Sequence, residues 1–172
     1  MDTLCSEDDP KSLDAQFCKN AAARGQLDLL KRARANGVPW DQDVCTCAAI
    51  NGHLEIIQWA RANGASWNER VCSEAVYGGH FETLQWARAN GAPWDEMTCA
   101  YAALKGNLDL LKWLRANGAP WDEDTCVFAA REGHMELLQW ARANGAPWKQ
   151  YHIYYEASHN GHLAIAEWVR ST

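Results

Sequence analysis

Residues 121–147 read WDEDTCVFAAREGHMELLQWARANGAP, and this stretch decides the fold because its landmarks recur along the chain every 27 residues. The recurring columns are Trp40, Trp67, Trp94, Trp121 and Trp148; Trp59, Trp86, Trp113 and Trp140; Gly25, Gly52, Gly79, Gly106 and Gly133; Cys18, Cys45, Cys72, Cys99 and Cys126; and Ala-Asn-Gly at 35–37, 62–64, 89–91, 116–118 and 143–145. Because five independent columns share one period, the sequence predicts a repeat array.

The repeats divide the chain into a short lead-in and one domain. Residues 1–12 are an acidic lead-in, and residues 13–172 form the repeat domain. Its six units begin at Leu13, Trp40, Trp67, Trp94, Trp121 and Trp148. The last unit carries one inserted residue before Gly161.

The first half of each unit is predicted to be a short helix. In the fifth unit, Asp122 is a good N-cap, and Trp121 and Cys126 occupy the two positions of a hydrophobic staple. The helix is expected over residues 123–132, with Gly133 in the left-handed conformation that ends helices.

The second half of each unit is predicted to be another helix, starting after His134 and ending at Asn144-Gly145 in the fifth unit. Its apolar face carries Met135, Leu137, Leu138, Trp140 and Ala141. No segment alternates with the period of a strand. Helices of about 10 residues do not persist alone in water, so stacking must stabilise them. The expected fold is therefore all-α, an α-solenoid of six helix-turn-helix units.

Residues 128–138 (FAAREGHMELL), followed by Asn144-Gly145-Ala146, resemble the ankyrin consensus A-A-x-x-G-H-L-E-V-V that ends in G-A. The resemblance extends from Leu13 to the end of the chain. The common ankyrin unit has about 33 residues, so about six are missing here, at the place where ankyrins form a β-hairpin finger. The resemblance therefore implies shortened or absent fingers. This short, Trp-rich type is similar to expanded ankyrin-type families of giant viruses, oomycetes and algae.

One face of the first helices varies between units while the opposite positions stay small or apolar. The varying columns have i, i+4 and i+7 spacing and so share a face. In ankyrin-like arrays the first helix lines the concave side, so this face resembles a recognition surface. The candidate partner-binding residues are Arg70, Glu74, Tyr77, Met97, Tyr101, Leu104, Asp124, Phe128 and Arg131. Exposed tyrosine and phenylalanine are typical anchors of interfaces; the alternative is a tolerant, solvated face.

Other repeating residues are interpreted as architecture. The tryptophans are expected to pack into the core between units. The cysteines occur once per unit without a C-x2-C pair, which favours small reduced core residues over a metal site. The histidines after the turn glycine, His53, His80, His134 and His162, are expected to form hydrogen bonds between loops.

A column of arginines also recurs, in the last turn of each second helix. It consists of Arg34, Arg61, Arg88, Arg115 and Arg142, with Arg170 extending it. Such a ladder could follow nucleic-acid phosphates. A structural role is favoured, because a cation complements the helix dipole there and acids such as Asp95, Glu96, Asp122 and Glu123 are expected nearby.

Composition and motifs exclude several classes of function. The 172 residues are 48% hydrophobic with a formal charge of −6, and neither a membrane-length apolar run nor a secretory leader is found. No catalytic motif is present, so the sequence predicts no enzyme, metal site, cofactor or small-molecule substrate.

The predicted function is a non-catalytic scaffold that binds a protein partner through the varying face. Two alternatives remain: a helical-repeat nucleic-acid binder, which the negative charge disfavours, and a structural subunit. The last unit supports the latter, since it keeps an apolar second helix and carries Tyr151, Tyr154 and Tyr155. Self-association could use this under-capped end. Reduced cysteines favour an intracellular location, in the cytoplasm or nucleus, of a host cell if the protein is viral.

Overall fold

Twelve helices and no β-strand make up residues 15–172, the part of the chain that the computed structural model describes. The helices are α1 (Ala15–Ala23), α2 (Leu27–Ala35), α3 (Asp43–Ile50), α4 (Leu54–Ala62), α5 (Arg70–Gly78), α6 (Phe81–Ala89), α7 (Glu96–Leu104), α8 (Leu108–Ala116), α9 (Glu123–Arg131), α10 (Met135–Ala143), α11 (Gln150–His159) and α12 (Leu163–Ser171). The predicted lead-in and the start of the first unit at Leu13 lie outside the described residues. The predicted helical solenoid without β-hairpin fingers is confirmed for residues 15–172.

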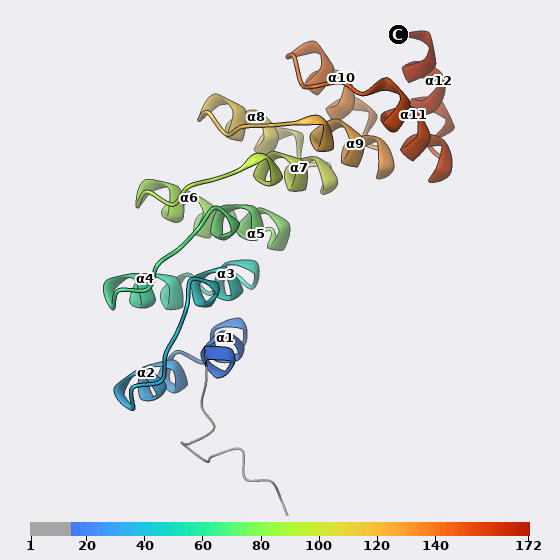
Figure 1. Cartoon of the computed structure of the whole chain (residues 1–172). Helices are drawn as coiled ribbons and strands as arrows, with labels where there is room; N and C mark the ends of the chain where they lie inside the picture. Colours follow the sequence, from blue (N-terminus) through green and yellow to red (C-terminus); the bar gives the residue numbers. More distant parts are fainter. Residues whose placement is uncertain (1–14) are drawn as a thin grey trace, which may run out of the picture.

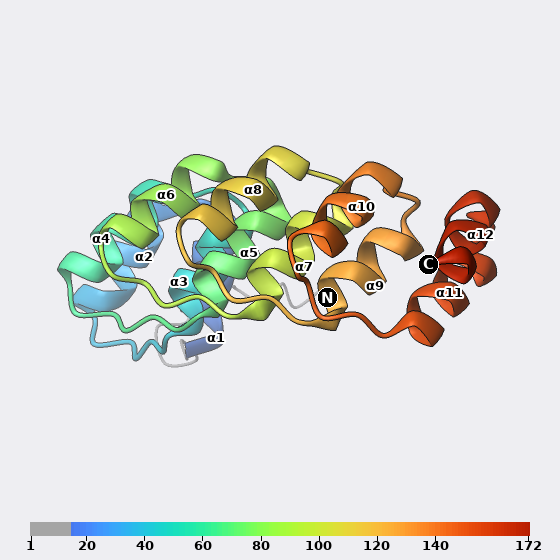
Figure 2. The ribbon, with the colours of Figure 1, turned by 90° about the horizontal axis from the view of Figure 1, so that it is seen from above.

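The helices stack in two rows that follow one arc (Figure 1). The first helices of the units, α1, α3, α5, α7, α9 and α11, form the inner row, and the second helices form the outer row. Seen from above, the two rows lie side by side along most of the array (Figure 2). The first-helix row therefore lines the concave side of the solenoid.

The Ala-Asn-Gly tripeptide ends the second helix through its side chain and its backbone together. In the fourth unit, Asn117 Nδ2 donates a hydrogen bond of 2.8 Å to the carbonyl of Trp113. Ala119 donates its backbone N–H to the carbonyl of Leu114 at 3.0 Å, across the left-handed Gly118. These bonds satisfy carbonyls that the helix end leaves without partners. The same asparagine bond recurs at 2.8 Å from Asn63, Asn90 and Asn144.

The first helix of the fifth unit begins and ends close to the predicted positions. Asp122 is its N-cap, and an oxygen of this carboxylate accepts the backbone N–H of Asp124 at 3.0 Å. The helix ends at Arg131, one residue before the predicted end, and Gly133 has the left-handed φ of 82°.

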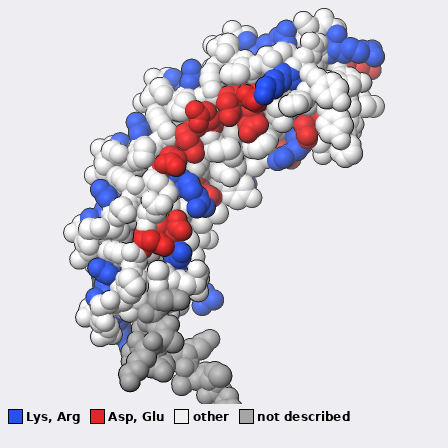
Figure 3. All heavy atoms as spheres, viewed as in Figure 1, with Lys and Arg blue, Asp and Glu red and all other residues white. Residues whose placement is uncertain are grey.

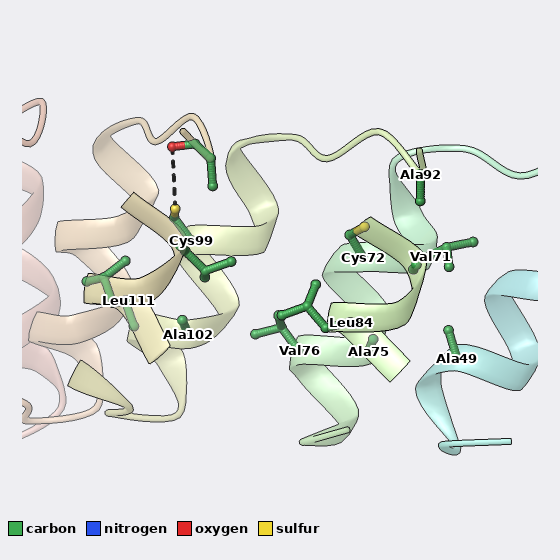
Figure 4. Close-up of a cluster of buried hydrophobic side chains, with 14 of the residues drawn as sticks. Ala49, Val71, Cys72, Ala75, Val76, Leu84, Ala92, Cys99, Ala102 and Leu111 are labelled. Atoms are coloured by element: carbon green, nitrogen blue, oxygen red, sulfur yellow. Dashed lines mark hydrogen bonds between the residues drawn. The ribbon is translucent and has the colours of Figure 1, made fainter. Parts of the chain in front are cut away.

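The core is continuous along the array and combines leucine, isoleucine and valine with many alanines and cysteines. The periodic cysteines Cys18, Cys45, Cys72, Cys99 and Cys126 are all fully buried. Figure 4 shows Cys72 and Cys99 within this core, with the Cys99 thiol donating to the carbonyl of Ala119 at 4.0 Å. Cysteine and alanine at these positions let consecutive first helices pack closely. The prediction of core cysteines is confirmed.

The tryptophans pack against this core, as predicted, although each remains partly exposed. They also form pairs, which was not predicted. The tryptophan that opens a unit meets the one on its second helix edge to face, with ring centroids 5.4 to 6.4 Å apart. The pairs are Trp40–Trp59, Trp67–Trp86, Trp94–Trp113, Trp121–Trp140 and Trp148–Trp168. This geometry adds to the stabilisation that burial of the rings provides.

The arginine ladder stacks on these tryptophans. The guanidinium carbons of Arg34, Arg61, Arg88, Arg115 and Arg142 lie 3.8 to 4.3 Å from the ring centroid of the tryptophan that opens the next unit. Arg34 Nη1 also donates to the carbonyl of Val38 at 2.7 Å, and Arg61, Arg88 and Arg115 make the equivalent bond to Ala65, Ala92 and Ala119. A planar guanidinium can stack and donate at the same time.

The structural role predicted for the ladder agrees with these contacts, which join each arginine to an indole ring and in most units to a backbone carbonyl. Within residues 15–172, none of these arginines forms an ion pair with the acids at the next helix start. Each guanidinium stacks on an indole ring, and those of Arg34, Arg61, Arg88 and Arg115 also donate to a backbone carbonyl of the following turn. We call this contact the Arg–Trp stack.

The buried thiols make stability depend on alkaline pH. Burial raises the pKa of Cys72, Cys99 and Cys126 to about 12, and that of Cys45 to about 11. An unfolded thiol ionises near pH 8.5, so above this pH the unfolded state releases protons that the folded state retains, and stability falls as the pH rises.

We expect each of these thiols to contribute a loss of about 1.4 kcal/mol per pH unit between roughly pH 9 and 11. The double variant Cys72→Ala/Cys99→Ala should show a correspondingly shallower decline in its free energy of unfolding. Urea unfolding at a series of pH values measures this slope. An unchanged slope would show that thiol burial does not control alkaline stability.

Candidate functional site

The varying face of the first helices is the face that solvent reaches. Val44, Cys45, Ala48 and Ala49, which belong to the constant positions, are fully buried. None of the nine candidate residues is fully buried; Arg70 and Tyr77 are exposed, and the other seven are partly buried. The division expected between a packing face and an accessible face therefore holds, whereas partner binding stays a prediction.

The structure brings four of the candidates together on α5 and α7. Arg70 lies 3.5 Å from Glu74, and its other terminal nitrogen lies 3.8 Å from Asp43 of the preceding unit. The rings of Tyr77 and Tyr101 are 5.0 Å apart. Burial, followed by the nearby Glu74 carboxylate, raises the pKa of Tyr101. The result is a cluster of aromatic rings edged by charges.

Two more candidates form a separate pair on α9. The guanidinium of Arg131 lies 4.6 Å from the centroid of the Phe128 ring and also pairs with Glu132 at 3.0 Å. This contact covers part of the Phe128 ring with a cation.

The remaining three candidates, Met97, Leu104 and Asp124, are partly buried, and two have structural contacts. The carbonyl of Leu104 is 3.2 Å from Nε2 of His134, and the backbone N–H of Asp124 donates to Asp122. These contacts use backbone atoms and leave both side chains accessible in part.

Acidic side chains gather over the first helices. Figure 3 shows them in a band along the arc, with lysines and arginines both beside this band and along the outer edge. The first turns of α3, α7 and α9 contribute Asp43, Glu96, Glu123 and Asp124. Acids at these helix starts are favoured by the positive end of the helix dipole. Asp43 pairs with Lys19 and Arg70, and Glu123 pairs with Lys149, whereas Glu96 and Asp124 form no ion pair within residues 15–172.

The histidines connect consecutive units, as predicted. Nε2 of His53 is 3.2 Å from the carbonyl of Ala23, and Nε2 of His134 is 3.2 Å from that of Leu104. Each acceptor lies at the end of the preceding unit's first helix. The prediction of hydrogen bonds between loops is confirmed at these two junctions.

The sequence analysis missed a groove between the third and fourth units. There Asn107 occupies the histidine column, and its Oδ1 caps α8 by accepting the backbone N–H of Leu110 at 3.0 Å. A groove of about 710 Å³ opens beside it. Tyr77 and Phe81, which are 40% and 42% exposed, contribute to its lining. Two features of the sequence could have indicated the groove: Asn107 replaces the histidine of other units, and position 81 is a phenylalanine.

The groove has an aromatic wall with a cation at its edge. The ring of Phe81 meets that of Trp113 edge to face, with centroids 5.1 Å apart. Nζ of Lys105 lies 4.4 Å from the centroid of the Tyr77 ring. Because Tyr77 belongs to both features, the groove adjoins the cluster on α5 and α7.

The C-terminal unit exposes apolar and aromatic groups, as its sequence indicated. Tyr151 is 74% exposed and Leu163 is 64% exposed. Tyr151 and Tyr155 stack with centroids 6.5 Å apart. Lys149 stands at the N-cap of α11, where its side chain makes no capping bond.

Two further observations concern metals and membranes. In the described range, residues 15–172, no group of three or more histidine, cysteine or acidic side chains is placed to hold a metal ion. Over the same range, none of the helices has the length and hydropathy that a bilayer crossing requires.

Paired helices stacked in two rows define a helical repeat solenoid, and comparison with known proteins gives its family. Residues 18–61, 45–88 and 72–115 match the family model for ankyrin repeats (many copies) and together cover more than half of the chain. The chain therefore belongs to the ankyrin-repeat family.

The fold is similar to that of a solved ankyrin structure. The crystal structure of the human ASB11 ankyrin repeat domain superposes with a TM-score of 0.64 and 16% sequence identity, over 90% of this chain and 82% of that chain. At this identity the similarity concerns the fold alone. No curated protein matches the sequence.

Gly52 and Gly79 together test whether the repeated histidine packs against the turn glycine of the preceding unit. Gly52 and Gly79 both have left-handed φ values, 72° and 80°. A Cβ on Gly52 would lie 2.4 Å from Nδ1 of His80, whereas nothing lies within 4 Å of a Cβ on Gly79. We expect Gly79→Ala to cost about 1–2 kcal/mol of backbone strain. Gly52→Ala should cost about 1–3 kcal/mol more, because His80 must move.

Urea unfolding of both variants measures this difference, and adding His80→Asn to Gly52→Ala should remove most of the extra loss. Equal destabilisation by the two alanines would contradict the close packing of His80 on Gly52.

Proposed function

We propose that this ankyrin-repeat chain is a non-catalytic interaction module that binds a protein partner through the varying face of its first helices. The observation that carries the proposal is the accessible cluster of Tyr77 and Tyr101, edged by Arg70 and Glu74, on a row whose opposite side is fully packed. Large rings held on a rigid support are typical interface anchors. Little conformational entropy is lost when such a surface binds.

The charge of the face favours a partner with a basic surface. Glu96 and Asp124 lie on the same row of first helices as the aromatic cluster and form no ion pair within residues 15–172. Complementary charge speeds encounter and disfavours acidic competitors. We therefore expect association to slow as the ionic strength rises.

The arginine ladder does not favour nucleic acid as the partner. Its guanidinium groups stack on tryptophans and donate to backbone carbonyls, so phosphate binding would have to displace these contacts. The net charge of −6 also disfavours nucleic-acid binding, because it repels phosphates. A filter-binding assay with a salt titration tests this alternative.

Self-association through the C-terminal unit is a second proposal, supported by the exposure of Tyr151 and Leu163. Exposed apolar groups lower their free energy by packing against another surface. Sedimentation velocity over a concentration series tests it: a monomer at every concentration removes the proposal.

Two finer assignments accompany this function. The 27-residue unit with its paired tryptophans supports placing the chain among the short, Trp-rich ankyrin-type families. The buried thiols support a reducing intracellular compartment, the cytoplasm or nucleus.

The direct test is affinity capture from a cell lysate with matched baits. The first variant is Tyr77→Ala/Tyr101→Ala/Phe128→Ala, and the control is Tyr151→Ala/Tyr154→Ala/Tyr155→Ala. We expect the first variant to lose a partner that the wild type and the control retain, with affinity falling about tenfold for each anchor worth about 1.4 kcal/mol. Helical circular dichroism checks that both variants fold.

If all three baits capture the same proteins, the varying face is not the binding surface. If only the C-terminal control loses the partner, the last unit is the binding surface instead.

A further inference from the structure

The chain contains four copies of a site that holds a histidine ring. At these junctions the turn glycine of one unit is covered by the histidine of the next, and a Cβ on that glycine would lie 2.4 to 2.8 Å from the nearest ring atom. The pairs are Gly25 with His53, Gly52 with His80, Gly106 with His134, and Gly133 with His162. At two of them a carbonyl two residues before the glycine lies 3.2 Å from the ring nitrogen.

The junction between the third and fourth units has the same backbone but no such ring. Gly79 keeps the left-handed φ of 80°, and nothing lies within 4 Å of a Cβ placed on it. Asn107 replaces the histidine and caps its own helix. The carbonyl of Tyr77 is equivalent to the carbonyls of Ala23 and Leu104, which accept from histidines at two other junctions. Within residues 15–172, no side chain donates to the carbonyl of Tyr77.

The walls of the groove are mostly apolar, and they carry one cation and one carboxylate, Lys105 and Asp109. Phe81, Leu110 and Trp113 line the groove on its apolar side. Lys105 stands at its edge, and within residues 15–172 its ammonium group forms no ion pair. A carboxylate next to the occupant's ring would complement that charge.

We propose that this groove receives a histidine side chain from an apolar, acidic segment of a protein partner. The imidazole packs on Gly79 and donates to the carbonyl of Tyr77, as His53 and His134 do at two of the other junctions. A neighbouring carboxylate pairs with Lys105. The inference rests on the proposed function, because it supplies the chemistry of a partner segment beside the cluster on α5 and α7.

The test uses the peptide acetyl-LHDL-amide as a probe and NMR of the isotope-labelled chain as the readout. We expect millimolar binding, typical of a short flexible peptide, with amide shift changes centred on Gly79 and Asn107. Acetyl-LFDL-amide, which lacks the ring nitrogens, and acetyl-LHKL-amide, which reverses the charge, should each bind at least about tenfold more weakly, a loss of about 1.4 kcal/mol.

Two variants complete the design. Asn107→His supplies the missing ring and should abolish binding at Gly79. His134→Asn removes a ring elsewhere and should create a second site, reported by the amide of Gly106. Both retain the aromatic cluster of the first-helix face.

The inference is overturned if no peptide shifts these amides, if Asn107→His binds the probe as the wild type does, or if the phenylalanine peptide binds equally well. It fails alone if the probe shifts no amide while the bait Tyr101→Ala/Phe128→Ala, which leaves the groove lining unchanged, still loses the partner. The proposed function fails alone if the probe binds here while the triple variant retains every partner.

Discussion

The stack of each arginine on the tryptophan that opens the next unit is the contact on which the rest of this solenoid depends. The guanidinium belongs to the last helical turn of the second helix of one unit, and the indole belongs to the first residue of the next unit. Each stack therefore joins two consecutive units across the connection between them. The contact recurs at all five connections between units, at 3.8 to 4.3 Å. Since a short helix pair is unstable alone, whatever joins the pairs decides whether the array folds.

The other repeating residues act around this contact. Ala-Asn-Gly ends the second helix and turns the chain so that the tryptophan can reach the arginine before it. The tryptophan then meets its partner on the second helix of its own unit, edge to face. Cysteine and alanine keep the first helices close together. The stack occupies the connection where longer ankyrin units have a finger, and we interpret it as the contact that holds this shortened connection in place.

Much of this architecture could be predicted from the sequence because it is periodic. The 27-residue columns identified the units, Asp122 and Gly133 marked the ends of a helix, and the constant positions indicated the core. The partner of the arginines could not be predicted in this way. Arg88 and Trp94 are six residues apart across a turn, and no helical period relates them, so the repeat pattern does not indicate that they touch.

The candidate site was predictable only in part, for a related reason. Variation between units identified Tyr77, Tyr101 and Phe128 as accessible positions, because packing fixes the residues opposite them. The groove forms where Asn107 replaces the repeated histidine, because no histidine ring then covers Gly79 of the preceding unit. What covers a glycine depends on how two units are placed in space, and a repeat pattern does not specify that placement.

A double-mutant cycle between Arg88 and Trp94 tests the central role of the Arg–Trp stack most directly. The single variants Arg88→Met and Trp94→Leu and the double variant would be compared by urea unfolding. The bond from Arg88 to the Ala92 carbonyl remains in Trp94→Leu, so the cycle isolates the stack. We expect a coupling of about 1–2 kcal/mol. Strictly additive losses would show that the arginine stabilises its turn without joining the two units.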